Sequence, residues 1–242
     1  MRVAAWAAGA VLVLSLTRAA LVNAQLGGGI GAVLDLETFV WTWQALSLSM
    51  AAAIGGALGV VIGWALRRPW IAGIGSICFA VSFALTGHSA ALPTPGIAPW
   101  IVSLHVLIAS FWFSAPLTLW PRGEMVDATL ARRLERFSAI AVWAIPVLFL
   151  LGVWLVWILA GSVAAVFSTT YGQLLIAKFS VGLIALGLGA FNKLSLTKAI
   201  ADGRAGGRSA LKRTLLAELT IFVIALLLVG IATTVTGPAE TF

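Results

Sequence analysis

The sequence predicts an all-α membrane protein, a polytopic helical bundle with about seven transmembrane helices. Of its 242 residues, 61% are hydrophobic and only 10% are charged, and the mean hydropathy is +1.08. A soluble domain of this length cannot bury so much apolar surface. The chain also divides into apolar segments of about 20 residues, the length needed to cross a hydrocarbon core of roughly 30 Å. Helices are expected because lipid cannot satisfy an unpaired backbone group, and no alternating strand pattern is present.

Seven segments meet the length requirement, and we expect them to form one transmembrane domain over residues 1–242. They are residues 3–22, 39–66, 70–91, 98–120, 137–160, 173–192 and 213–236. The first has a rival interpretation as a cleaved signal peptide, because Val22-Asn23-Ala24 resembles a small-residue cleavage site. In the second, Ala51, Gly55, Gly59 and Gly63 recur every four residues. This spacing predicts a face of small side chains that packs closely against a neighbouring helix.

The basic residues indicate the orientation of these segments. They gather at Arg2, at Arg67 and Arg68, and in the loops 122–136 and 193–213, whereas the intervening loops carry acidic residues or no charge. Under the positive-inside rule the N-terminus is cytoplasmic and the C-terminus external. The net charge of +7 therefore reflects membrane topology, and we expect no nucleic-acid partner.

Only two histidines occur, and they lie on either side of the short turn Pro93-Thr94-Pro95-Gly96. His88 and His105 fall near the outer ends of the third and fourth segments, with a depth offset of roughly 5 Å at 1.5 Å per residue. Adjacent antiparallel helices pack together, so two imidazoles there could hold one metal ion. Copper, zinc and iron all accept imidazole ligands, and the same pair could instead be the axial ligands of a haem. Local hydrogen bonding of each histidine is the alternative.

Other candidate residues lie along the same segments. Met50 and Cys78 sit deeper than the histidines and could continue a path of soft ligands for copper, although filling gaps in the packing is the more ordinary role. Cys78 is the single cysteine, which excludes an internal disulfide and a zinc or iron–sulfur site built from cysteines. Arg18, Lys178 and Glu218 are charged residues within segments, where charge is costly and anchoring near a membrane surface is the simplest explanation. Catalytic motifs are absent, so we expect no enzyme.

Several short motifs occur in the order found in one known family. They are Gly87-His88, the run from His105 to Trp112, Arg136-Phe137-Ser138, the run from Thr170 through Tyr171-Gly172 to Lys178, Gly189-Ala190-Phe191-Asn192-Lys193, and Leu211-Lys212-Arg213 followed by Glu218 and Pro238. Over about residues 85–238 the chain resembles the copper resistance protein D (CopD) family. Ser114-Ala115-Pro116 departs from the pattern, because the family usually has Gly-Gly there.

The resemblance implies a protein of the bacterial inner membrane that transports copper or confers copper tolerance. It implies His88 and His105 as copper ligands, and it makes Trp112, Lys178 and Glu218 motif positions of unknown role. A periplasmic CopC-like copper carrier is an implied partner, besides the lipid bilayer. Two other functions stay open: a haem b protein of membrane electron transfer, and a membrane scaffold that recruits such a carrier.

Overall fold

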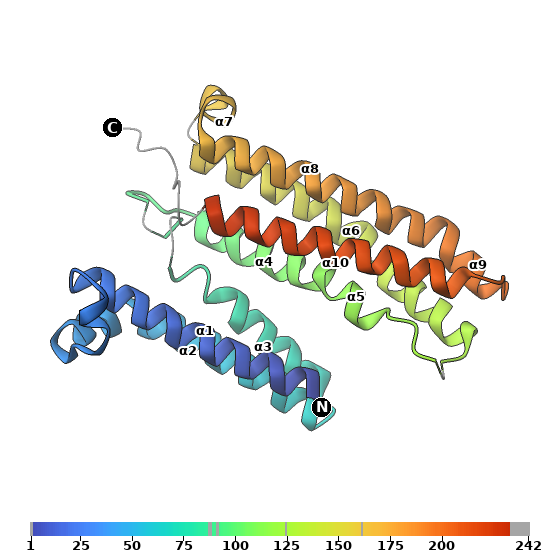
Figure 1. Cartoon of the computed structure of the whole chain (residues 1–242), viewed down its shortest axis with the longest axis horizontal. Coiled ribbons are helices and arrows are strands. Elements are labelled where there is room, and N and C mark those ends of the chain that lie inside the picture. The colour runs from blue at the N-terminus through green and yellow to red at the C-terminus, as the bar shows by residue number, and fades with distance from the viewer. Residues whose placement is uncertain (1, 87–88, 91, 124, 161, 233–242) are drawn as a thin grey trace. The chain divides into compact units, whose positions relative to one another are not determined.

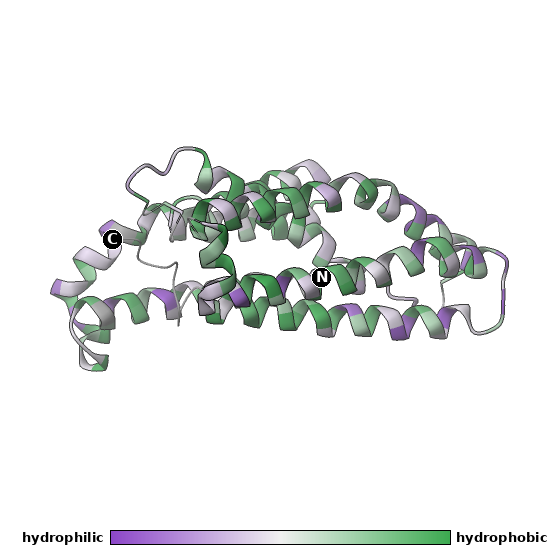
Figure 2. Cartoon of the chain, turned by 90° about the horizontal axis from the view of Figure 1, so that it is seen from above, coloured by the Kyte–Doolittle hydropathy of each residue, from purple (hydrophilic) through white to green (hydrophobic). Residues whose placement is uncertain are grey.

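The computed structural model describes residues 2–86, 89–90, 92–123, 125–160 and 162–232. Within these ranges every regular element is a helix and there is no β-strand, which confirms the predicted all-α polytopic membrane fold. The chain forms two compact units, Met1–Leu107 and Ile108–Phe242, which we call unit 1 and unit 2. Apolar residues predominate along the helices of both units (Figure 2). The expectation of one domain over the whole chain stays a prediction.

Unit 1 is built on three neighbouring helices (Figure 1). They are α1 (Arg2–Leu26), α2 (Leu36–Ala65) and α3 (Pro69–Val81), and a short 3₁₀ helix, Ile30–Leu34, connects the first two. The fourth helix, α4 (Ala98–Phe113), begins in unit 1 and ends in unit 2. Asp35 caps α2 by accepting hydrogen bonds from the backbone N–H groups of Glu37 and Thr38. The Thr38 hydroxyl also donates to this carboxylate, and together these bonds lower the pKa of Asp35.

A buried asparagine holds the connection between α1 and α2. Asn23 is 1% exposed, and its amide Nδ2 donates to the carbonyl oxygens of Ala32, Val33 and Asp35 over 2.7 to 3.2 Å. Its Oδ1 accepts a hydrogen bond of 2.8 Å from the Thr42 hydroxyl of α2. Backbone carbonyl groups that are turned away from water need hydrogen-bond partners within the protein. Asn23 does this for three of them and joins the two helices at the same time.

Close backbone contact between α2 and α3 depends on glycines. A Cβ atom added to Gly56 would lie 2.5 Å from the backbone N of Phe79, and one added to Gly63 would lie 2.3 Å from that of Ala72. The prediction of a small-residue face on this helix is therefore right in kind but wrong at Gly55, around which there is open space. A strict four-residue spacing drifts around a helix of 3.6 residues per turn, so Gly56 replaces Gly55 on the contact face.

Unit 2 contains three long helices that lie side by side (Figure 1). The helical elements after α4 are α5 (Ala115–Thr118), α6 (Asp127–Ala160), α7 (Val163–Ser168), α8 (Thr170–Phe191), a π-helical turn η2 (Asn192–Leu196), α9 (Thr197–Ala201) and α10 (Gly207–Ile231). The Ser114-Ala115-Pro116 departure coincides with the break between α4 and α5, where Pro116 occupies the first turn of α5. Leu130, Leu134, Leu211 and Leu215 pack α6 against α10.

Five helical segments are long and apolar enough to cross a membrane among the residues described. They are Leu46–Ala65, Ala98–Thr118, Asp127–Ala160, Thr170–Ala201 and Gly207–Ile231, and two shorter apolar helices, Val13–Ala24 and Pro69–Val81, account for the other predicted segments. The third segment, expected over 70–91, is wrong in its extent because α3 ends at Val81. The Ser82 hydroxyl donates to the Phe79 carbonyl over 2.6 Å and so offers that carbonyl a partner other than the next helical N–H.

The glycine contact gives a direct test of the packing in unit 1. A Cβ atom at Gly75 would lie 2.5 Å from the backbone N of Val60, and this backbone atom cannot rotate away. We expect Gly75→Ala to lower the free energy of unfolding by about 2 kcal/mol, as overpacking does. Thermal unfolding in detergent measures the change. Gly73→Ala, on the same helix with open space around it, is the control and should unfold close to the wild type. Equal melting temperatures for the two variants would contradict the contact.

Candidate functional site

Of the two histidines, only His105 lies among the residues that the structure describes. His105 lies on α4, seven residues after its first residue, and is half-buried with its Nδ1 atom buried. His88 lies outside the described residues. The Ser103 hydroxyl donates a buried hydrogen bond of 2.9 Å to the Ala80 carbonyl, which holds the first half of α4 against α3. His105 follows Ser103 by two residues, or about 200° around a helix, so it lies on a different face from this contact. A site shared by both histidines stays a prediction.

The two sulfur-bearing residues of the predicted copper path lie in different surroundings of unit 1. Met50 is 9% exposed and packs with Leu46 of α2 against Ala19 and Val22 of α1. Cys78 is exposed on α3. Arg18 donates a hydrogen bond of 3.2 Å to the Ser49 hydroxyl, next to Met50, and so also contributes to the contact of α1 with α2. The copper path through Met50 and Cys78 stays a prediction.

Trp112 lies in the aromatic core of unit 2. It is 4% exposed, and its ring centroid lies 5.4 Å from that of Phe222 on α10 and 6.2 Å from that of Phe149 on α6. Phe113 stacks on Phe222 at 4.4 Å, and Phe149 meets Phe179 of α8 edge to face at 5.2 Å. These contacts join α4, α6, α8 and α10. The position of Trp112 therefore has a packing role, because each ring is held in place by rings from other helices.

The two charged motif residues have different surroundings. Lys178 is half-buried on α8, and no hydrogen bond or ion pair to its amine is found among the described residues. Glu218 of α10 is 2% exposed, and its Oε1 accepts a hydrogen bond of 2.9 Å from the Asn192 amide. On α8, Gly189 lies near this carboxylate: a Cβ atom added there would be 3.9 Å from Oε1.

Asn192 is the centre of a buried polar cluster that was not singled out as a site residue in the sequence. Its Oδ1 accepts a hydrogen bond of 2.6 Å from the Thr214 hydroxyl, and its backbone carbonyl accepts one of 2.9 Å from Thr197. It opens the π-helical turn η2, and such turns occur frequently at functional sites. The available signal was the run Gly189-Ala190-Phe191-Asn192-Lys193, which carried the family resemblance without a role for its asparagine.

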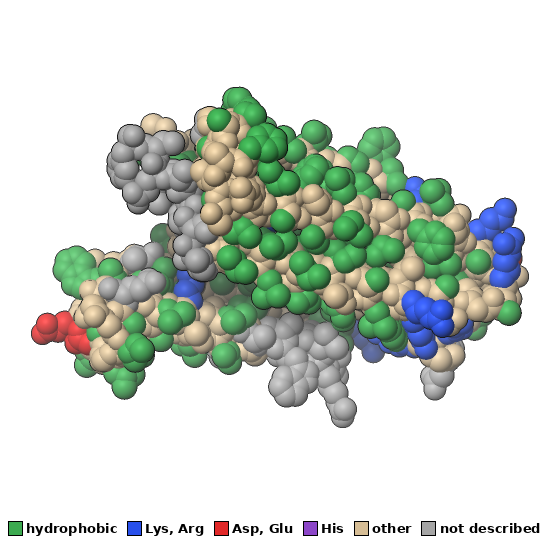
Figure 3. All heavy atoms as spheres, turned by 45° about the horizontal axis from the view of Figure 1, so that its top comes forward, with side chains coloured by type: hydrophobic (Ala, Val, Ile, Leu, Met, Phe, Trp, Pro, Cys, Tyr) green, Lys and Arg blue, Asp and Glu red, His purple; other side chains and the backbone are tan. Residues whose placement is uncertain are grey.

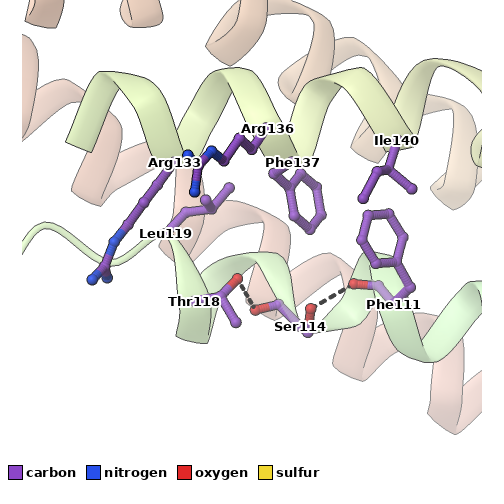
Figure 4. A pocket seen from close by; sticks show the side chains of 8 residues that line it. All are labelled: Phe111, Ser114, Thr118, Leu119, Arg133, Arg136, Phe137 and Ile140. Atoms are coloured by element: carbon purple, nitrogen blue, oxygen red, sulfur yellow. Dashed lines mark hydrogen bonds between the residues drawn. The ribbon is translucent and has the colours of Figure 1, made fainter. Parts of the chain in front are cut away.

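The basic residues of unit 2 gather at the end where α9 lies (Figure 3). Arg208 anchors this end: its guanidinium pairs with Asp127 at 2.9 Å and donates to the carbonyls of Met125 and Arg122. A half-open pocket of about 390 Å³ lies here between α4, α5 and α6. Figure 4 shows its apolar wall, with Phe111 and Phe137, and the nearby side chains of Arg133 and Arg136. Two guanidinium groups repel a metal cation, so this pocket does not suit copper.

Clusters of three or more metal-ligating residues (His, Cys, Asp or Glu) are absent from the part of the chain that the structure describes. A copper site built from two histidines would be a smaller set of ligands than such a cluster. Within the described residues of unit 2, a buried cluster of polar groups is formed by Glu218, Asn192, Thr214 and Thr197.

Comparison with known proteins identifies the segment that contains these groups. Residues 131–232 match the family model of copper resistance protein D. This segment belongs to the CopD family. It lies inside the predicted range of 85–238 and includes Lys178, Asn192 and Glu218, whereas Trp112 and both histidines precede it.

A curated relative supports the CopD assignment. The chain is 30% identical over 162 residues to the copper transport protein CutJ of Bacillus subtilis (strain 168). The aligned part covers 65% of this chain and 29% of the relative, so the chain spans less than a third of that protein's length. No solved structure matches the chain.

The packing role of Trp112 is testable by truncation. We expect Trp112→Ala to lower the free energy of unfolding by about 3 kcal/mol or more, because it removes a buried ring that contacts two other helices. Trp143→Ala is the control, since Trp143 is 77% exposed within the protein. Thermal unfolding in one detergent compares them. A similar loss in both variants would contradict a special role for Trp112 in the core.

Proposed function

We propose that this chain transports copper across the bacterial inner membrane. The observation that supports this proposal most is the CopD match over residues 131–232, which covers α8, α9 and α10 and most of α6. Similarity to the copper transport protein CutJ also supports the proposal. Among the described residues, five helical segments have the length and apolar composition of membrane spans. Copper is the transported substrate here, and we assign no enzymatic step to the chain.

The proposed orientation places the basic end of unit 2 in the cytoplasm. Lys and Arg residues from the start of α6, from η2 and α9, and from the start of α10 gather at this end (Figure 3). An excess of basic residues is typical of cytoplasmic loops. The N-terminus is then cytoplasmic and the C-terminus periplasmic, and a periplasmic CopC-like carrier is the proposed source of copper.

His88 and His105 are the proposed copper ligands at the outer face. His105 lies about 10 Å along α4 from Ala98, at 1.5 Å per residue. A metal ion bound there would therefore lie a short distance below the outer end of this helix. Neutral imidazole is a good ligand for copper in either common oxidation state. His88 lies in the sequence between the end of α3 at Val81 and the start of α4 at Ala98, and this nearness to His105 along the chain is the reason to propose one site rather than two.

Metal and haem analysis of purified protein tests this site. We expect wild-type protein to bind copper, and His88→Ala and His105→Ala each to lose most of it, because a single remaining imidazole is a weak ligand set. Inductively coupled plasma mass spectrometry measures the copper, and absorption spectra reveal haem. Unchanged copper in both variants would exclude the shared site. A strong Soret band that both substitutions abolish would instead support the haem protein.

Met50 and Cys78 are the proposed inner steps of the copper path. Thioether and thiol sulfur suit Cu(I), and both residues lie in unit 1 deeper than the outer histidines in the sequence-based topology. The burial of Met50 against α1 also fits simple packing. We expect Met50→Leu and Cys78→Ala to slow copper uptake into proteoliposomes while the protein stays folded. Uptake at the wild-type rate in both variants would remove these residues from the path.

A further inference from the structure

The buried carboxyl group of Glu218 lies well inside a helix that is long enough to span a membrane. Glu218 follows Gly207, the first residue of α10, by eleven residues, or about 16 Å at 1.5 Å per residue. The 25 residues of the helix extend about 37 Å. The carboxyl group is therefore close to mid-depth, toward the basic end, and it is 2% exposed. Ionisable side chains at such depth are costly and are commonly functional.

The partner of this carboxyl group is neutral. Asn192 donates the one hydrogen bond that we find to Glu218 in the described part of the chain, and the ion pairs found there are Arg204 with Asp202 and Arg208 with Asp127. No basic nitrogen of a described residue thus lies within 4.0 Å of Glu218.

The charged groups on the elements around α10 lie away from the carboxyl group. On α8, Lys178 and Tyr171 precede Gly189 by 11 and 18 residues, or by about 16 and 27 Å along the helix. Lys193 of η2 and Lys198 of α9 are exposed, and α5 has no titratable residue.

At the basic end, the remaining charged groups are held at the surface. Lys212 and Arg213 of α10 are exposed. Arg208, which precedes Glu218 by ten residues, is paired with Asp127 of α6. The other charged residues of α6 are all exposed; they are Arg132, Arg133, Glu135 and Arg136. None of these groups neutralises a carboxylate at Glu218.

The site fits a carboxylic acid better than a carboxylate. An ionised carboxylate in an apolar interior needs a cation or several hydrogen-bond donors, and one amide donor does not offset its loss of hydration. A neutral acid needs no cation and fewer hydrogen-bond donors. Its carbonyl oxygen accepts the hydrogen bond from Asn192, and the other oxygen carries the proton. Either form can accept the bond from Asn192, so it is the burial of the carboxyl group without a cation that favours the neutral acid.

Polar and apolar neighbours lie on opposite sides of Glu218 along α10. One turn toward the basic end, the Thr214 hydroxyl donates to Asn192, which in turn donates to Glu218. One turn in the other direction, Phe222 is buried against Trp112 and Phe113. A proton that leaves the carboxyl group therefore meets polar groups on the side of the basic end and an aromatic core on the other side.

We propose that Glu218 is a reversible proton-binding site, protonated at neutral pH and exchanging its proton with solvent at the basic end of unit 2. The only bond that breaks is the O–H bond of the acid, which leaves a carboxylate and a proton. Asn192 is a positioning residue that holds the carboxyl oxygen. Proton binding at Glu218 does not depend on copper, although a carboxylate formed by proton release would attract a cation.

Infrared spectroscopy of the purified full chain in lipid vesicles tests the proposal. We expect the wild type at neutral pH to show the C=O stretching band of a protonated carboxyl group. The band should shift when the sample is moved to D₂O, because the proton exchanges, and should fade reversibly as the pH is raised. Glu218→Gln should abolish it. Glu135→Gln, which changes an exposed carboxyl group on α6, is the control and should retain it.

Two further measurements keep the test decisive if Glu218→Gln does not fold. Labelling the wild type with ¹³C-glutamate should lower the frequency of the band, and a band that does not move would overturn the proposal. Asn192→Leu should raise its frequency, since the carbonyl oxygen loses its donor, and an unchanged frequency would overturn the role of Asn192. Absence of any such band in the wild type at neutral pH, or a band that resists D₂O, would also overturn the proposal. None of these results depends on whether the chain carries copper.

Discussion

A polar group inside a membrane protein must find its partners within the protein, and one buried asparagine meets this constraint in each unit. Asn23 satisfies three carbonyls of the loop between α1 and α2 and binds the Thr42 hydroxyl. Asn192 joins Glu218 and Thr214 of α10 to the π-helical turn after α8. In both places an amide, with its two donors and its acceptor, does what water would do in a soluble protein. Each amide therefore ties two helical segments together.

The helices of the two units pack through different kinds of contact. In unit 1, α2 and α3 approach through glycines until their backbones touch, and no side chain at Gly56, Gly63 or Gly75 fits. In unit 2, aromatic rings around Trp112 fill the space between four helices. Hydrophobic burial gives little drive for association in lipid, so close contact in both cases must come from dispersion and shape.

Much of the fold could be predicted from the sequence because hydropathy reports where lipid requires a helix. All seven predicted segments correspond to apolar helices, two of them shorter than a full span. Details that depend on rotation and local hydrogen bonding were less accessible. A four-residue repeat ignores the drift of the helix and so places Gly55 on the contact face. Hydropathy alone does not show that α3 ends at Val81, where the Ser82 hydroxyl donates to the Phe79 carbonyl.

The candidate site shows the same limit. Glu218 was noticeable as a charge within an apolar segment, but Asn192 was not, because an amide near a helix end has no distinctive signal in one sequence. Only the fold shows that the two meet across 26 residues. The family resemblance, now supported over residues 131–232, supplied copper, which neither the composition nor the geometry of the described residues identifies.

Copper movement across a sealed bilayer tests the central claim most directly. The whole chain would be reconstituted into vesicles that contain a copper-sensitive dye, and copper would be added outside with a reductant to supply Cu(I). The account predicts that the dye responds faster than in protein-free vesicles, in proportion to the amount of protein. The contradicting result is a dye response no faster than in protein-free vesicles, whichever face of the protein points outward, although the chain binds copper or a copper carrier at the vesicle surface. This result would exclude transport and leave the scaffold as the function.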